Sequence, residues 1–190
     1  NRKQMENPVS IHAIERFLGD EALKNNWTIP KAADTGKSVL VVGAGPGGIS
    51  AAYHLCKMGH KVTVVDSKPA VGGMLRYGIP SYRLPRDVLD SEVAHIEKMG
   101  VTFKFNTRID NLAASIKDGG YDAAFLAIGA HVGRSVEIPN DGSVKIIEAV
   151  KFLSDMETED KTPELGKKVA VYGGGNTAID CVRTAVRLGA

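Results

Sequence analysis

The stretch Ser38 to Asp66 reads SVLVVGAGPGGISAAYHLCKMGHKVTVVD, and it decides the fold. Its opening run, 38–42, is nearly continuous in apolar residues, as is typical of a strand buried on both faces of a parallel sheet. A glycine-rich turn follows, then apolar residues at helical spacing from about Pro46 to Met58, and then a second β-branched run over 61–65. This order predicts a βαβ unit of an α/β, Rossmann-like fold.

The turn GAGPGG places Gly43, Gly45 and Gly48 at the GxGxxG spacing of dinucleotide-binding sites. The first glycine permits the tight turn, the second lets the backbone approach a pyrophosphate, and the third lets the helix pack closely on the strand. Asp66 lies 18 residues after Gly48, where a carboxylate can accept hydrogen bonds from a ribose diol. A glycine-rich turn without a ligand is the alternative, but the surrounding strands, helix and acid favour a dinucleotide site.

The glycine-rich segment occurs twice. Residues 36–60 and 166–190 align without a gap at an offset of 130, and eight of the 25 aligned positions are identical. The second copy is therefore predicted to repeat the strand, turn and helix, with Ala178 in place of the third glycine. Only 17 residues follow Gly173, whereas a βαβ unit needs about 30, so we expect a second nucleotide domain that is cut short.

Composition narrows the function classes. The 190 residues carry 24 Lys+Arg against 22 Asp+Glu, a net charge of +2 that argues against a nucleic-acid or acidic membrane partner. The two cysteines, Cys56 and Cys181, form no CxxC pair, the five histidines have no metal-ligand spacing, and no apolar run of about 18 residues is present. We expect a protein of the reducing cytoplasm without a metal site.

Three stretches carry a family resemblance: GAGPGG at 43–48, GGMLRYGIPSYRLP at 72–85 and GGGNTAID at 173–180. With them the chain resembles the flavin domain of NADPH-dependent glutamate synthase small subunits and their relatives, including the flavin-binding part of dihydropyrimidine dehydrogenase. NPVSI at 7–11 and a helix leading to Trp27 resemble the segment that follows the iron-sulfur cysteines of that family. The resemblance covers nearly the whole chain.

The resemblance implies FAD as the first nucleotide. It assigns the pyrophosphate to Gly43, Ala44, Gly45, Pro46 and Gly47, with Gly48 as the third glycine of the turn. It assigns the adenosine ribose and the start of a flavin-side loop to Asp66, Ser67, Lys68, Gly72, Gly73 and Met74. The family usually has Glu where Asp66 stands, so the ribose contact would come from a side chain that is one methylene shorter.

Other flavin contacts follow from the same resemblance. Arg83 would lie near the flavin, where a fixed cation can stabilise the anionic reduced ring; the alternative is a surface arginine on a loop. The backbone at Ile109 would contact adenine. Ala127 and Gly129 would approach the cofactor after a strand within 121–129, unless that stretch is only a buried strand.

The second copy is expected to bind NADPH. The resemblance assigns this site to Gly174, Gly175, Asn176, Thr177 and Ala178. Asp180 would either face the nicotinamide or be a solvated carboxylate favoured by the start of a helix. The residues that distinguish NADPH from NADH would lie beyond Ala190, so the resemblance alone indicates NADPH.

These features divide the chain into an N-terminal helical segment over 1–35, an FAD-binding domain over 36–165 and the start of an NADPH-binding domain over 166–190. Apolar spacing predicts helices over 87–99, 111–117 and 146–156, a strand over 101–105, and a polar linker over 159–166.

The implied reaction is hydride transfer from NADPH to flavin, followed by electron release through iron-sulfur centres to a larger catalytic subunit or domain. The cofactors supply the reactive atoms, so no catalytic side chain is predicted. We expect the chain to be an inactive fragment of a larger reductase. Three alternatives remain: a structural fragment without tight FAD binding, a flavin disulfide reductase, which would need a nearby cysteine pair, and a methyltransferase-type binding module.

Overall fold

The computed structural model describes residues 4–5, 7–133, 137–158 and 163–190, so the first part of the predicted linker lies outside the described residues. Four parallel strands form one sheet in the order β3-β2-β1-β4. They are β1 (Ser38–Val42), β2 (Lys61–Val65), β3 (Thr102–Lys104) and β4 (Ala123–Leu126). The predicted α/β fold with a parallel sheet is confirmed.

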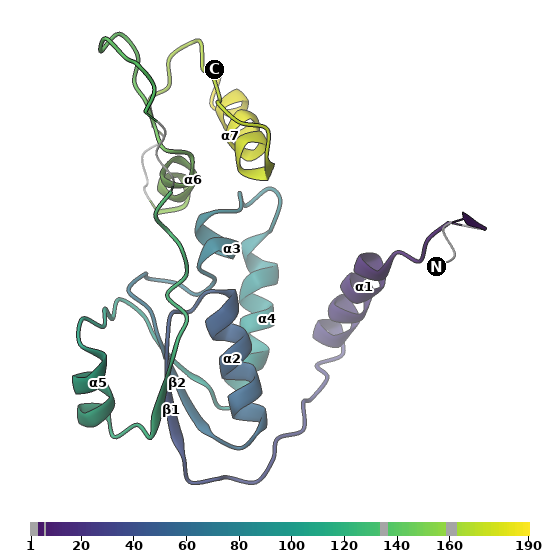
Figure 1. The fold of residues 1–190 in the computed structure, drawn as a ribbon. Coiled ribbons are helices and arrows are strands. Elements are labelled where there is room, and N and C mark those ends of the chain that lie inside the picture. The colour runs from purple at the N-terminus through teal and green to yellow at the C-terminus, as the bar shows by residue number, and fades with distance from the viewer. Residues whose placement is uncertain (1–3, 6, 134–136, 159–162) are drawn as a thin grey trace.

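Helices cover both faces of this sheet (Figure 1). One face packs on α2 (Pro46–Lys57) and α4 (Arg86–Lys98), and the other packs on α5 (Leu112–Gly119). Successive strand residues point to opposite faces, so Val41 packs toward α2 and α4 while Leu40 and Val42 pack toward α5. Burial on both faces explains why β1 is apolar at almost every position.

A second group of helices lies beyond the sheet, on the side of the short helix α3 (Met74–Tyr77) (Figure 1). Helices α6 (Ala149–Thr158) and α7 (Asn176–Arg187) pack on each other through Phe152, Leu153 and Cys181. The predicted helices over 87–99, 111–117 and 146–156 correspond to α4, α5 and α6, with shifts of one to three residues at their ends.

The strand predicted at the start of the second copy is wrong. Residues 167–174, which include the apolar run before Gly173, have no regular secondary structure, and Val169 and Tyr172 are 43% and 84% exposed. The described residues offer this run no neighbouring strand, and an extended segment is a strand only when a neighbour takes up its hydrogen bonds. Its helix, α7, forms as expected.

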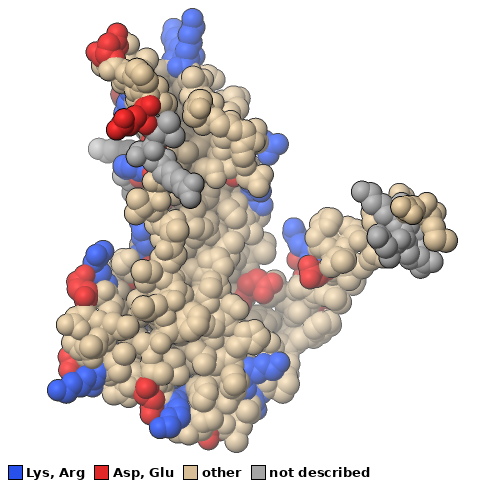
Figure 2. Space-filling view, in the orientation of Figure 1, with Lys and Arg blue, Asp and Glu red and all other residues tan. Residues whose placement is uncertain are grey.

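The N-terminal helix α1 (Ile11–Lys24) projects away from the body of the molecule (Figure 1). None of its residues is buried. Within the described part of the chain, no helix has both the length and the apolar character needed to cross a bilayer. Acidic and basic side chains are interspersed on the face shown in Figure 2, as the near-neutral net charge predicts.

Candidate functional site

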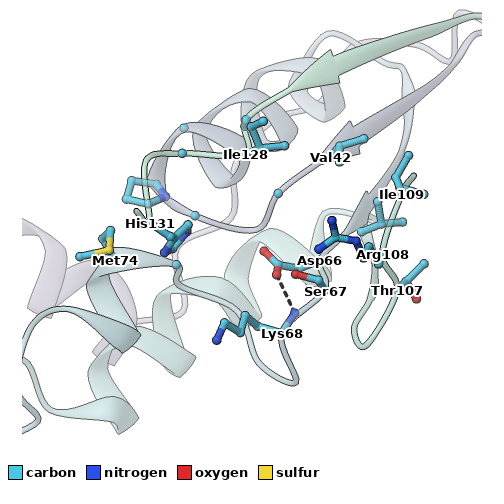
Figure 3. Close-up of a pocket in the computed structure, with 18 residues that line it drawn as sticks. Val42, Asp66, Ser67, Lys68, Met74, Thr107, Arg108, Ile109, Ile128 and His131 are labelled. Carbon is cyan, nitrogen blue, oxygen red and sulfur yellow. Dashed lines mark hydrogen bonds between the residues drawn. The ribbon is translucent and has the colours of Figure 1, made fainter. Parts of the chain in front are cut away.

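A cavity of about 550 Å³ lies where the carboxyl ends of the strands meet the first glycine-rich turn (Figure 3). Ligands of open α/β sheets bind at this edge. The residues that line it include Gly43, Gly45, Pro46, Gly47, Asp66, Ser67, Lys68, Gly73, Met74, Ile109, Ala127 and Gly129, all of them predicted from the sequence.

Two glycines of the first turn are required by packing within the protein. Gly43 has a φ of 109°, and a Cβ atom there would lie 2.2 Å from the carbonyl oxygen of Ala127. A Cβ atom at Gly48 would lie 1.8 Å from the carbonyl oxygen of Gly43. Both contacts are far inside van der Waals distance, so these two positions accept only glycine without movement of the backbone.

The other two glycines face the cavity instead. A Cβ atom at Gly45 would approach only the Cα atom of Gly73, at 3.7 Å, and one at Gly47 would approach only Ala127, at 4.0 Å. Gly45 precedes α2, whose first turn receives no hydrogen bond from a capping side chain. The amides of such a helix start have no partner within the helix, so they are available to an anion in the cavity.

Asp66 lies at the end of β2 and joins three segments of the cavity wall. One carboxylate oxygen accepts a hydrogen bond from the amide of Ala44 at 2.7 Å, and the other accepts from the amide of Lys68 at 2.8 Å (Figure 3). The backbone carbonyl of Asp66 accepts from the amide of Thr107 at 2.8 Å. Each carboxylate oxygen keeps acceptor capacity beyond its one protein donor.

Three predicted residues support the cavity without lining it. Ala44 is fully buried, and its amide holds Asp66. Gly48 packs under Gly43, as described above. Gly72 donates its amide to the carbonyl of Ala44 at 2.8 Å and has a φ of 123°. Their place in the motif reflects the packing of the turn and not exposure to a ligand.

Arg83 is also absent from the cavity lining. Its guanidinium pairs with Asp180 on α7, with Nη1 2.8 and 2.6 Å from the two carboxylate oxygens. The hydrogen bond and the charge of Asp180 raise the pKa of Arg83 above its ordinary value. Arg83 is thus paired with a residue of α7 instead of lying free on a surface loop. Asp180 is buried against this cation, so the alternative of a solvated carboxylate is wrong.

The cavity has further walls that sequence reasoning did not assign: Val42, Val65, Thr107, Arg108, Ile128 and His131. Each lies at or shortly after the end of a strand, and this position is the only signal that could have indicated them. Asn106 carries the chain into this wall with a φ of 53°. His131 is exposed.

The second glycine-rich turn is open. Gly173 has a φ of 133°, but Cβ atoms at Gly174 and Gly175 would meet nothing within 4 Å. Asn176 and Thr177 are exposed at the start of α7, and Ala178 is buried. The five predicted NADPH-binding residues therefore surround an accessible helix N-terminus.

Neither cysteine lies beside the cavity or beside the other. Cys56 belongs to the main core, and Cys181 belongs to the cluster between α6 and α7. Among the described residues, no group of three or more His, Cys, Asp or Glu side chains is placed to hold a metal ion. A dithiol of the kind that a flavin disulfide reductase needs is thus not formed by these two cysteines.

Comparison with known proteins agrees with this geometry. The chain is 40% identical over 216 aligned residues to the beta subunit of NADP(+)-dependent formate dehydrogenase from Moorella thermoacetica, covering 100% of this chain and 30% of the relative. It is 35% identical to the NADPH glutamate synthase small chain of Escherichia coli K12, covering 96% of this chain and 41% of the relative. The chain therefore spans less than half the length of these relatives.

A solved structure shows the same fold. Mycobacterium tuberculosis FprA in complex with NADPH superimposes with a TM-score of 0.64 at 26% identity, over 77% of this chain and 36% of that one. Residues 37–190 match the family model described as pyridine nucleotide-disulphide oxidoreductase. This chain belongs to the pyridine nucleotide-disulphide oxidoreductase family.

Proposed function

We propose that this chain is the FAD-binding part, with the first elements of the NADPH-binding part, of an oxidoreductase that passes hydride from NADPH to flavin. The cavity carries the proposal: two cavity-facing glycines, an uncapped helix start and Asp66 surround one space. A glycine turn without a ligand would not need Gly45 and Gly47, since neither is required by packing within the protein.

The residues present fit the diphosphate of FAD. A diphosphate is anionic and needs close approach to backbone amides, which Gly45 and Gly47 permit because they carry no side chain. The first turn of α2 adds the positive end of its dipole. Lys68, whose Nζ lies 5.3 Å from the centre of the Tyr77 ring, adds a cation to the same wall.

Asp66 fits the adenosine ribose. It already binds Ala44 and Lys68 through one hydrogen bond to each oxygen, so a ribose hydroxyl would take a remaining lone pair. This contact fixes the nucleotide relative to the turn, because Ala44 belongs to the turn itself. Ile109, beyond Thr107 on the same wall, offers its backbone to the adenine.

Bound FAD would supply the redox chemistry, accepting hydride from a nicotinamide. The protein's own part is to bind, orient and exclude water. Ala127 and Gly129 continue from β4 along the cavity, and Met74 begins the loop on the opposite wall. These groups restrict the space available to the isoalloxazine and hence its orientation.

The remaining elements of the proposal concern the larger protein. The domains would extend over 36–165 and 166–190, with α7 and its glycine turn receiving NADPH. The relatives named above are a beta subunit and a small chain, which supports a larger partner subunit as the electron acceptor. Iron-sulfur centres would carry the electrons between them.

A cavity variant tests the flavin site. Gly45→Ala adds one methyl group to the cavity with no clash inside the protein, so we expect an unchanged fold and at least a tenfold weaker affinity for FAD. Gly166→Ala adds the same methyl group far from the cavity and should bind FAD normally. The measurement is the visible flavin spectrum during titration with FAD. A wild-type protein that is still colourless after incubation with FAD and removal of the unbound flavin would contradict the proposal and favour a structural fragment.

A further inference from the structure

The loop between α3 and α4, residues 78–85, contacts α7 through a charge pair whose carboxylate is buried. Arg83 donates from Nη1 to both carboxylate oxygens of Asp180, and the Asp180 side chain is only 6% exposed while that of Arg83 is 40% exposed. A carboxylate buried this deeply is strongly unfavourable without its cation. The pair therefore fixes the position of α7 on the loop.

Tyr82 provides a second contact to the same helix. Its hydroxyl donates to the backbone carbonyl of Asp180 at 3.5 Å, and the guanidinium of Arg187 lies 3.9 Å from the centre of its ring. Asp180 and Arg187 are about two helical turns apart. Contacts at two separate turns restrain the rotation of α7 as well as its position.

Arg86 makes the loop itself rigid. It binds the carboxylate of Glu157 on α6, with Nε and Nη2 at 3.1 and 2.8 Å from the two oxygens, and the amide of Ser81 donates to the same carboxylate at 3.2 Å. The Arg86 guanidinium also donates to the backbone carbonyls of Leu75, Arg76, Ile79 and Leu84.

This loop joins the two nucleotide sites. Helix α3 leads into this loop, and Gly73 and Met74 at the start of α3 line the flavin cavity. At the far end of the loop, Arg83 holds Asp180, which lies one turn into the helix that begins at the second glycine turn. One restrained segment therefore runs from the cavity wall to the predicted nicotinamide module.

We infer that Arg83 is a positioning residue, which through Asp180 sets the orientation of the second glycine turn relative to the flavin cavity. The inference rests on the proposed function. Hydride transfer requires close and aligned donor and acceptor atoms, and a misplacement of about 1 Å can cost about 100-fold in rate. Loss of the pair should slow transfer more than it weakens NADPH binding, because the glycine turn itself stays intact.

Two other roles for these residues make different predictions. If Arg83 acted directly on the flavin, its loss would shift the flavin midpoint potential, and Asp180→Asn would have little effect. If Asp180 acted directly on the nicotinamide, its loss would be harmful while Arg83→Gln would be mild. A positioning pair makes the two single variants alike and the double variant no worse than either.

The experiment uses the full-length natural protein loaded with FAD. Stopped-flow absorbance measures the rate of flavin bleaching at saturating NADPH, and the NADPH dependence of that rate gives its dissociation constant. For Arg83→Gln, Asp180→Asn and their double variant, we expect a similar fall of at least tenfold in rate, less than threefold change in the dissociation constant, and an unchanged flavin potential.

Two further variants serve as a partial rescue and as a control. Arg83→Lys should recover at least a third of the wild-type rate, because a single nitrogen of Arg83 makes both contacts to Asp180. Arg16→Gln removes an exposed ion pair to Asp20 on α1 and should leave the rate unchanged. Wild-type rates in Arg83→Gln, a shifted potential, or multiplicative losses in the double variant would overturn the positioning role.

A failure of the proposed function would give different results from a failure of the positioning role. A wild-type protein that binds no FAD, or whose flavin is not bleached by NADPH, would overturn both the function and the positioning role that rests on it. Normal bleaching in the wild type together with normal bleaching in Arg83→Gln would overturn only the positioning role. Hydrogen exchange of the α7 amides provides a check without cofactor, and we expect exchange at least tenfold faster in Arg83→Gln.

Discussion

The two glycine-rich segments of this chain share eight of 25 aligned positions, yet they have different structures. In the first, β1 pairs with β2 on one edge and with β4 on the other, and Gly43 and Gly48 are in tight contact with neighbouring backbone. In the second, the run before Gly173 is not a strand, and Cβ atoms at Gly174 and Gly175 would meet nothing within 4 Å. The helix forms in both copies.

The difference shows which elements of the motif form from their own residues alone and which need partners elsewhere in the chain. A helix satisfies its hydrogen bonds within its own segment, so α7 forms without a sheet. A central strand depends on neighbours on both edges, which the second segment lacks among the described residues. The requirement for glycine at Gly43 likewise comes from a residue far away in the chain, Ala127, whereas Gly48 is required by the carbonyl of Gly43 within the same turn.

Matched alanine substitutions should give the largest contrast between the copies. Gly43→Ala and Gly173→Ala both place a side chain at positive φ, but only the first also meets a carbonyl, at 2.2 Å. We expect Gly43→Ala to lower the free energy of unfolding by about 3 kcal/mol or more, and Gly173→Ala to lower it by about 1 kcal/mol. Urea unfolding followed by circular dichroism measures both.

Equal losses in the two variants would contradict this comparison. They would mean that backbone strain alone, and not the close approach of the sheet, sets the requirement for glycine in the first copy.

The two cysteines should report a smaller contrast in local stability. Among the described residues, Cys56 lies in a cluster of ten buried side chains, while Cys181 lies in one of three. Small clusters open more easily, so iodoacetamide should label Cys181 at least tenfold faster than Cys56 in the native protein. Mass spectrometry of the labelled peptides gives both rates, and equal rates would show that α6 and α7 open only with the whole domain.

The pH dependence of the free energy of unfolding gives a second test of the burial of Cys181. Burial, aided by the charges of Asp180 and Glu148, raises the pKa of the Cys181 thiol from 9.0 to about 11. Between these values the unfolded chain loses the thiol proton first, so stability falls as pH rises from about 9 to about 11. In Cys181→Ala this part of the decline should be absent from urea unfolding curves. If the stability of Cys181→Ala fell with pH as much as that of the wild type, the Cys181 thiol would be exposed to water in the folded protein.

The smallest effect is expected at the start of the first strand. Lys37 pairs with Asp122 at 2.8 Å, whereas Lys167, its equivalent in the second copy, forms no ion pair with the described residues. Lys37→Ala should lower the urea midpoint slightly and Lys167→Ala should not, since exposed ion pairs contribute little.

Low pH should abolish the difference in urea midpoint between the wild type and Lys37→Ala. Its ammonium and the amide of Ser38 hold the pKa of Asp122 below the ordinary 3.8. The contribution of the pair is present above that value and is lost as pH falls through the lower pKa of the folded protein. The wild-type and Lys37→Ala midpoints should therefore converge at low pH, and a difference that persisted there would exclude the ion pair as its cause.

Much of the fold was predictable because its signals are local. The apolar run at 38–42, the GxGxxG turn and the helical spacing after it identified β1 and α2 and the cavity beside them. The position of Arg83 was not predictable, because its partner Asp180 lies 97 residues away in the chain. Likewise, Thr107 and Arg108 line the cavity only because β3 is the neighbour of β2.

The hydrogen bonds of Asp66 have a consequence for the thermodynamics of nucleotide binding. Because this carboxylate already ties the turn at Ala44 to Lys68, and its backbone ties in Thr107, the recognition surface is assembled before a ligand arrives. A binding partner then bears little of the entropy cost of ordering loops. Asp66 thus gives the cavity a wall that is preorganised before any nucleotide binds.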